Sequence, residues 1–288
     1  MMSYIKVKTL QEAQDLLNEL APQVQVIAGG TDLFLQEKPE HLIDISALSE
    51  LKKINEKDGL LEVGSAVTHS MAGASSLLLN KATALSEACL QVGSPQVRNV
   101  GTLGGNVINA APAADAAVAL AALGAEALLA DRSGNMRTVA LDQLYSGFNC
   151  SAVDCSSDIL VKFVFPFCGT GEGSAFARFA ARRALALPMA NTAVRIKIED
   201  GLIARVAVVA APVKPAPTRF DQTETFLTGQ PATEETWLKA EACASEEAQV
   251  RGSLLRCSAD YRRHLIGVLV ARALRTAAER ALAGKDVL

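Results

Sequence analysis

The sequence predicts an α+β protein of two domains, and three observations point to this class. The chain has 288 residues, of which 50% are hydrophobic and 20% are charged, so it can bury a substantial core. Segments with the period of strands and segments with the period of helices follow one another along most of its length. Three glycines lie within residues 168–174, where they disfavour any regular element. We therefore expect a first domain at 1–168, a linker at 169–174 and a second domain at 175–288.

The individual elements follow from local patterns. A helix is expected at 11–20, where Ala13, Leu16, Leu17 and Leu20 recur at helical spacing. The pair Asp200-Gly201 lies between two alternating segments and is the strongest short hairpin signal in the chain. In chain order, the other expected elements are strands at 24–28, 41–45 and 60–67, helices at 75–89 and 115–123, a hairpin of 125–130 with 136–139, a strand at 158–165, paired strands at 192–199 and 202–210, and helices at 234–247 and 259–282.

Composition excludes several classes of function. The formal net charge is −3 and no basic stripe is present, which argues against a nucleic-acid partner. The N-terminus shows no signal for export. The alanine-rich stretch 110–130 is interrupted by Pro112, Asp115, Gly124 and Glu126, so it reads as a buried helix and strand rather than a membrane span. We expect a cytoplasmic protein without a membrane or nucleic-acid partner.

Six cysteines are present, and none forms a Cys-x-x-Cys pair. In a chain of this length, buried reduced thiols are the expected state. Cys150, Cys155 and Cys168 offer the alternative of an iron or zinc site, but their spacing is irregular and no histidine lies nearby. The sequence therefore predicts no metal site on this chain.

Two glycine-rich segments, 28–32 (Ala-Gly-Gly-Thr-Asp) and 101–106 (Gly-Thr-Leu-Gly-Gly-Asn), carry the main functional signal. Each follows an apolar or β-prone stretch and is read as a turn whose backbone N–H groups can approach a phosphate, with Thr31, Thr102 and Asn106 adding polar side chains. Neither matches the Gly-x-Gly-x-x-Gly or Walker pattern. Each segment taken alone also fits a plain turn without a ligand, but the pair points to two loops that close on one flavin nucleotide.

Asp115 lies nine residues after Asn106, at the start of a predicted helix. Its carboxylate could accept hydrogen bonds from a ribose or adenine group. A helix cap or a partner of the helix dipole is an equal alternative for the same residue.

These segments also carry a family resemblance. The run 93–106 (GSPQVRNVGTLGGN), followed by Ala-Pro-Ala-Ala-Asp at 111–115, closely resembles the FAD-binding medium subunit of molybdenum hydroxylases of the xanthine dehydrogenase and carbon monoxide dehydrogenase family. The resemblance extends to residues 28–33, 64–69 and 258–265, and also to 175–178, so it covers essentially the whole chain.

What the resemblance implies is a two-subdomain FAD-binding fold of the p-cresol methylhydroxylase and vanillyl-alcohol oxidase type, with subdomains at about 1–55 and 56–168. A C-terminal α/β domain like that of the CO dehydrogenase flavoprotein follows. FAD is expected to be held noncovalently between the two subdomains. His69 is the histidine of a family-like motif, but a polar residue at a helix start is favoured over a covalent flavin link, and His69 is left outside the predicted site.

The resemblance also implies a set of cofactor-binding residues. Segments 26–32 and 102–106 are expected to hold the pyrophosphate from two sides. Asp115 matches a ribose-side or adenine-side carboxylate, Leu160 an apolar contact, and Arg178 a flavin contact where relatives often carry lysine. The full predicted set is Val26, Ile27, Ala28, Gly29, Gly30, Thr31, Asp32, Leu33, Val92, Val97, Thr102, Gly104, Gly105, Asn106, Asp115, Leu160 and Arg178.

No iron–sulfur framework or molybdopterin motif is visible, so the resemblance implies one subunit of an electron-transfer complex. Its expected partners are a molybdopterin-binding large subunit and a [2Fe-2S] small subunit, with NAD+ as acceptor and a dimer of heterotrimers as assembly. One alternative is a subunit of an aromatic-thioester reductase, whose relatives carry a cysteine-rich insertion that is absent here. Another is a noncatalytic flavin-binding assembly module. Purine, nicotinate, aldehyde and carbon monoxide chemistry all remain open for the complex.

Overall fold

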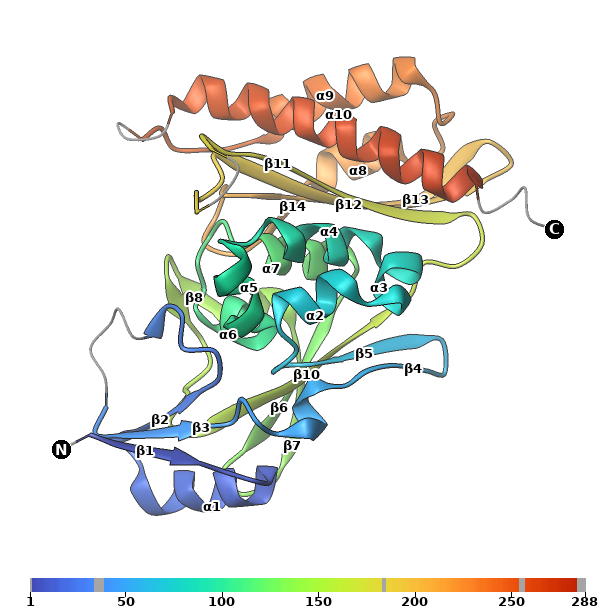
Figure 1. The fold of residues 1–288 in the computed structure, drawn as a ribbon. Coiled ribbons are helices and arrows are strands. Elements are labelled where there is room, and N and C mark those ends of the chain that lie inside the picture. The colour runs from blue at the N-terminus through green and yellow to red at the C-terminus, as the bar shows by residue number, and fades with distance from the viewer. Residues whose placement is uncertain (1, 34–38, 183–184, 254–256, 284–288) are drawn as a thin grey trace.

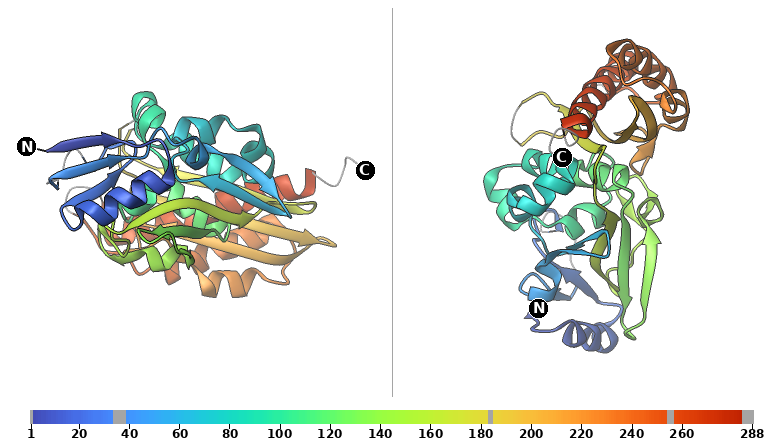
Figure 2. Two further views of the ribbon diagram at one scale, coloured as in Figure 1. Left: turned by 90° about the horizontal axis from the view of Figure 1, so that it is seen from below. Right: turned by 90° about the vertical axis from the view of Figure 1, so that its right-hand side faces the viewer.

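The computed structural model describes residues 2–33, 39–182, 185–253 and 257–283, and shows three main sheets with helices between and around them (Figure 1). The expected end of the second domain at 288 lies outside these residues. The N-terminal strands and the C-terminal helices lie at opposite ends of the molecule (Figure 2). In the described part of the chain, no helix has the length and apolar character needed to cross a bilayer.

The first sheet is small and parallel. It has the order β1–β3–β2, made of β1 (Ser3–Lys6), β3 (His41–Asp44) and β2 (Val24–Ile27). Helix α1 (Leu10–Leu20) packs on it, and its N-cap Thr9 accepts a hydrogen bond from the Glu12 N–H. The carboxyl end of β2 therefore leads directly into the first glycine segment.

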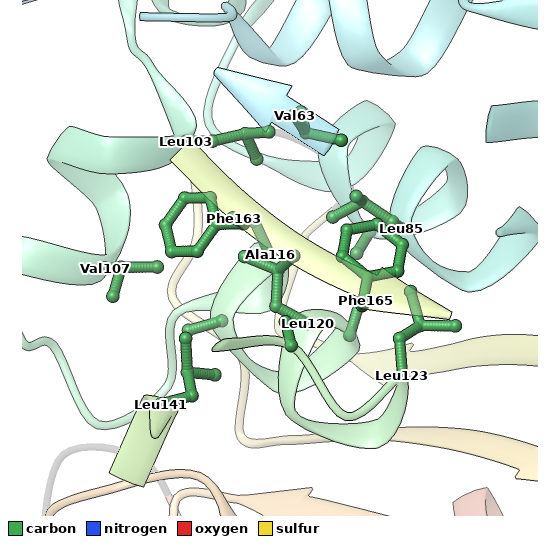
Figure 3. Packing of buried hydrophobic residues seen from close by; sticks show 14 of the residues in the cluster. Val63, Leu85, Leu103, Val107, Ala116, Leu120, Leu123, Leu141, Phe163 and Phe165 are labelled. Atoms are coloured by element: carbon green, nitrogen blue, oxygen red, sulfur yellow. The ribbon is translucent and has the colours of Figure 1, made fainter. Parts of the chain in front are cut away.

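The second sheet is five-stranded and antiparallel, with the order β4–β5–β10–β6–β7. Its central strand carries Phe163 and Phe165, which pack among Leu85, Leu103 and Leu120 from three helices (Figure 3). The strands of this sheet are β4 (Ile54–Lys57), β5 (Leu60–Gly64), β10 (Asp158–Pro166), β6 (Glu126–Asp131) and β7 (Met136–Ala140). This part of the chain also contains a two-stranded ribbon of β8 (Tyr145–Gly147) and β9 (Cys150–Ser151) and the 3-10 turns η2 (Ser49–Lys52) and η3 (Leu141–Leu144). Its helices are α2 (His69–Ala74), α3 (Ser76–Lys81), α4 (Thr83–Gln91), α5 (Pro95–Val100), α6 (Leu103–Ile108) and α7 (Asp115–Ala122).

The single helix expected at 75–89 is wrong, because the structure divides it into α3 and α4 at Ala82. The groups freed at the break find partners elsewhere in the fold. The Lys81 carbonyl accepts a hydrogen bond from the Cys168 N–H at 2.8 Å, and the Ala84 N–H donates to Ser174 Oγ at 3.2 Å. Tertiary hydrogen bonds thus overrule the continuous helical periodicity.

The C-terminal sheet is antiparallel and covered on both faces. Helices α8 and α10 pack on its outer face, α9 packs against both of these helices, and α4 and α7 pack on the inner face (Figure 1). Side-chain alternation explains this, since Val194 and Ile196 join the outer core while Ala193 joins the core of the first domain. Its elements are β11 (Glu172–Phe179), β12 (Ala190–Glu199), β13 (Leu202–Ala211), β14 (Thr218–Arg219), α8 (Asp221–Leu227), α9 (Glu234–Glu247) and α10 (Ala259–Ala283).

Strand β11 begins at Glu172, inside the segment 169–174 that we expected to be a linker. The close approach of helix α10 explains why position 173 of this strand is a glycine. A Cβ there would lie 2.1 Å from the Ala277 carbonyl oxygen, so the missing side chain lets α10 approach β11 closely. The hairpin expected at Asp200-Gly201 is present, and both residues have a positive φ, as a tight hairpin turn requires.

Candidate functional site

The two glycine segments line one cleft of about 630 Å³, a size typical of small-molecule sites. The cleft is lined by the end of β2, by α5 and α6, and by the region around β9. Most of the predicted cofactor residues line it. They are Val26, Ile27, Ala28, Gly29, Gly30, Thr31, Asp32, Leu33, Val92, Val97, Thr102, Gly105 and Asn106.

The first glycine segment packs directly against the end of α5. A Cβ on Gly29 would lie 2.2 Å from the Val100 carbonyl oxygen, a distance that no side chain can adopt. Gly30 has a φ of +65°, a conformation that glycine adopts at little cost. Glycine at these two positions therefore allows the two segments to meet.

The first segment also presents backbone donors. Among the described residues, no acceptor is present for the backbone N–H groups of residues 29–32. Successive free N–H groups of this kind are what an anionic ligand requires from a turn. This segment therefore has the form that the sequence predicts for phosphate binding.

The second segment differs from the predicted turn, because residues 103–108 form helix α6. Thr102 is its N-cap, and its hydroxyl accepts a hydrogen bond from the Gly105 N–H at 3.1 Å. Gly104 does not line the cleft. A Cβ there would lie 2.8 Å from Ser65 Cβ, so this glycine lets α6 pack on the segment after β5.

Two buried side-chain atoms at the cleft have no hydrogen-bond partner in the described part of the protein. They are Nδ1 of His69 and Oδ1 of Asn106. Burial, with a smaller effect of the nearby Arg98 charge, lowers the pKa of His69 from 6.5 to about 4. The imidazole is therefore neutral at physiological pH.

The predicted site omits His69, but the structure places this residue in the cleft wall. Local sequence cannot distinguish it from a histidine at an ordinary helix start. Its backbone N–H donates to the Gly101 carbonyl at 3.0 Å, and this contact between distant segments brings it to the cleft. The one available signal was its place in the family-like motif 64–69.

A further wall of the cleft comes from residues near β9, which sequence reasoning also missed. Asn149, Ser151 and Val153 to Ser156 line it. The Cys155 carbonyl accepts a hydrogen bond from the Val26 N–H at 3.0 Å, which fixes this wall to β2. Burial raises the pKa of the Cys155 thiol to about 11, and all six cysteines are free of disulfide bonds.

Asp115, Leu160 and Arg178 are not among the residues that line the cleft. Asp115 Oδ2 lies 3.1 Å from Arg178 Nε, and Asp115 Oδ1 accepts a hydrogen bond from Asn191 Nδ2 at 2.6 Å. Arg178 also donates to the Ala186 carbonyl. Burial raises the pKa of Asp115 to about 6, against the opposing effect of Arg178. Leu160 belongs to the hydrophobic core.

Two family models match the chain. Residues 1–168 match the FAD binding domain in molybdopterin dehydrogenase, and residues 175–277 match the CO dehydrogenase flavoprotein C-terminal domain. Together they cover almost all of both expected domains.

Similar proteins agree with these models. The nicotinate dehydrogenase FAD-subunit of Eubacterium barkeri is 31% identical over 80% of each chain. The xanthine dehydrogenase FAD-binding subunit of Escherichia coli O157:H7 is 29% identical over 96% of this chain and 95% of that one. The solved structure of carbon monoxide dehydrogenase from Hydrogenophaga pseudoflava superposes with a TM-score of 0.89 at 28% identity, over 97% and 98% of the two chains.

These matches confirm both the predicted fold class and the resemblance that carried it. The structural match covers 97% of the chain. The chain belongs to the family of FAD-binding subunits of xanthine and CO dehydrogenase-type molybdenum hydroxylases, and it is an oxidoreductase subunit.

Proposed function

We propose that the cleft holds FAD noncovalently, with its pyrophosphate between segments 29–32 and 102–106. The observation that carries this proposal is the set of unused backbone N–H groups on the first segment, which faces a wall containing two unpartnered polar side chains. A phosphate ester of a sugar alcohol offers acceptors and hydroxyl groups to such a site. The residues present therefore fit the cofactor of the family.

In this assignment the different parts of the cleft have different roles in binding. The N–H groups of residues 29–32 bind phosphate oxygens, while Thr102 holds α6 in place through its cap. Val92 and Val97 supply an apolar wall. A contact of Asp115, Leu160 or Arg178 with FAD stays a prediction, because these residues lie outside the cleft wall.

We further propose that the chain is the electron-exit subunit of its complex. It would take electrons from a [2Fe-2S] small subunit, which receives them from a molybdenum large subunit, and deliver them to NAD+. When bound, FAD supplies the chemistry for this step, since flavins exchange electrons singly or in pairs. The names of the relatives, a medium chain or an FAD subunit, support a role as one subunit among several. A dimer of heterotrimers and a cytoplasmic location are part of the same proposal.

The first experiment uses the purified chain alone. After incubation with FAD and gel filtration, we expect oxidised-flavin absorption bands and about one FAD per chain. Gly105→Val, which adds a side chain at the cleft wall, should lose most of the bound FAD. Gly169→Val is the matched control, because Gly169 lies outside the cleft and a Cβ there is 3.8 Å from the nearest atom, Phe167 Cε2. Full FAD occupancy in Gly105→Val would overturn the assignment of the loops.

The second experiment tests the electron path. NADH added without oxygen to the FAD-loaded chain should bleach the flavin absorption, because the proposed step is reversible. Flavin that is bound but is reduced neither by NADH nor by the substrate of the assembled complex would favour the noncatalytic assembly module instead.

A further inference from the structure

His69 is a buried histidine to which the proposed function assigns no role, and its surroundings indicate a role in ligand binding. It is only 2% exposed and begins helix α2, yet it lines the cleft. Its Nδ1 is sealed from solvent and has no hydrogen-bond partner among the described residues. A buried polar atom without a partner is unfavourable by about 1–3 kcal/mol, so such atoms are rare unless a ligand satisfies them.

The ring lies where both glycine segments meet. The point at which a Cβ of Gly101 would sit is 3.5 Å from His69 Cδ2 and 3.6 Å from Thr31 Oγ1. Thr31 carries one of the free N–H groups of the first segment, and Gly101 precedes the cap of α6. The Cδ2 edge of the imidazole thus lies beside the phosphate-binding part of the cleft, where a half-turn of the ring places Nδ1, and the backbone bond to Gly101 fixes the position of the residue.

Asn106 adds a second unpartnered atom at the same wall, and the two residues differ in chemistry. A neutral imidazole can donate from one ring nitrogen, whereas Asn106 Oδ1 can only accept. A donor and an acceptor together match a phosphate oxygen next to a sugar hydroxyl.

We propose that His69 is a cofactor-binding residue whose imidazole donates a hydrogen bond from Nδ1 to an oxygen of the FAD pyrophosphate. The inference rests on the proposed function and deepens it by adding a residue of the second wall to the phosphate site. The lowered pKa of His69 agrees with it, because a neutral ring donates without placing a second charge beside Arg98.

The test compares FAD and ADP binding to three variants of the purified full-length apoprotein, using calorimetry. His69→Phe keeps a ring and removes the donor, and it should weaken FAD and ADP binding alike, by about 10- to 100-fold, as expected for a hydrogen bond to a charged group. His69→Asn places an amide near the position of Nδ1 and should recover much of this loss. His264→Phe, at an exposed position of α10, should bind both ligands as the wild type does.

A structural role would give a different pattern. Because Nδ1 is unpartnered without ligand, His69→Phe should unfold at the same urea concentration as the wild type, or a higher one, in the absence of FAD. If His69→Phe without FAD unfolds at a lower urea concentration than the wild type, the inference is overturned. So would a loss confined to FAD with normal ADP binding, since ADP carries the pyrophosphate without the flavin.

A direct signal comes from nitrogen NMR of labelled histidine. Addition of ADP should shift the Nδ1 resonance of His69 and leave that of His264 unchanged. If the wild-type protein binds neither FAD nor ADP, the proposed function itself fails. If the wild type binds both and His69→Phe binds them equally well, the proposed function stands and only the role of His69 is lost.

Discussion

Two sets of buried polar side chains in this protein differ in the partners that they have within the chain. At the cleft, His69 Nδ1 and Asn106 Oδ1 have no partner among the described residues. In the buried cluster formed by Asp115, Arg178 and Asn191, the Asp115 carboxylate lies against both other side chains, although Arg178 Nε and Asn191 Oδ1 have no hydrogen-bond partner among the described residues. Polar groups that satisfy one another stabilise the fold, whereas groups left open are available to a ligand. The two sets also differ in place, since His69 and Asn106 line the cleft whereas Asp115, Arg178 and Asn191 are not among its lining residues.

The largest effect is expected from Asp115→Ala, which breaks the buried cluster. It leaves Arg178, whose side chain is 7% exposed, buried without its anionic partner. We expect the free energy of unfolding of the apoprotein to fall by about 3–5 kcal/mol in urea denaturation. Asp15→Ala, an exposed acid on α1, is the control and should change stability by no more than about 0.5 kcal/mol. Unchanged stability combined with weaker FAD binding would assign Asp115 to the cofactor instead.

The next effect concerns how the titration of His69 changes the stability of the apoprotein with pH. His69 titrates near pH 6.5 when unfolded and near 4 when folded, so the unfolded chain binds more protons between these values. Lowering the pH from 7 to 4 should therefore cost the wild-type apoprotein about 3 kcal/mol through this residue. His69→Phe should lack this part of the acid sensitivity. The check is the stability difference between wild type and variant at several pH values, and a constant difference would contradict it.

A smaller effect is expected from Gly29→Ala, which acts on the contact between the two glycine segments. Its new Cβ would lie 2.2 Å from the Val100 carbonyl oxygen, so the segments must separate. Overpacking of this kind is unfavourable by about 1–3 kcal/mol, and FAD affinity should fall together with stability. Gly169→Ala, with ordinary space around it, should match the wild type in both measurements. Normal FAD affinity in Gly29→Ala would show that the cleft does not depend on this contact.

The smallest effect is expected from Asn106→Ala. Loss of one acceptor should weaken FAD binding about tenfold, or about 1.4 kcal/mol, in fluorescence titration. Stability without FAD should stay within about 0.5 kcal/mol of the wild type, since Oδ1 has no partner in the described chain. Asn55→Ala, on the exposed part of β4, serves as the control. Equal FAD affinities of Asn106→Ala and Asn55→Ala would remove Asn106 from the site.

Sequence reasoning was most successful where a local pattern is sufficient. The positive φ values at Asp200 and Gly201 follow from the residues themselves, and the long helix ending at Ala283 follows from sustained periodicity. Helices of six residues, such as α5 and α6, are too short for a period to show, so the second glycine segment was read as a turn.

Long-range contacts account for the remaining errors. The break at Ala82 depends on hydrogen bonds to Cys168 and Ser174, nearly a hundred residues away. His69 became part of the cleft only through its bond to Gly101. The contacts of Asp115 with Arg178 and Asn191 also come from distant segments, so a motif of neighbouring residues cannot reveal them, while its cofactor role stays a prediction.

The two-sided C-terminal sheet also has a consequence for the order of synthesis. Among the described residues, those that line the cleft all lie at or before Ser156, while α4 and α7 are covered by strands made only with residues 172–211. Domains tend to fold from the N-terminus as the chain leaves the ribosome. A nascent chain that has reached residue 168 thus carries all of the described cleft residues, but it still exposes an apolar helical face until strands β11 to β13 are made.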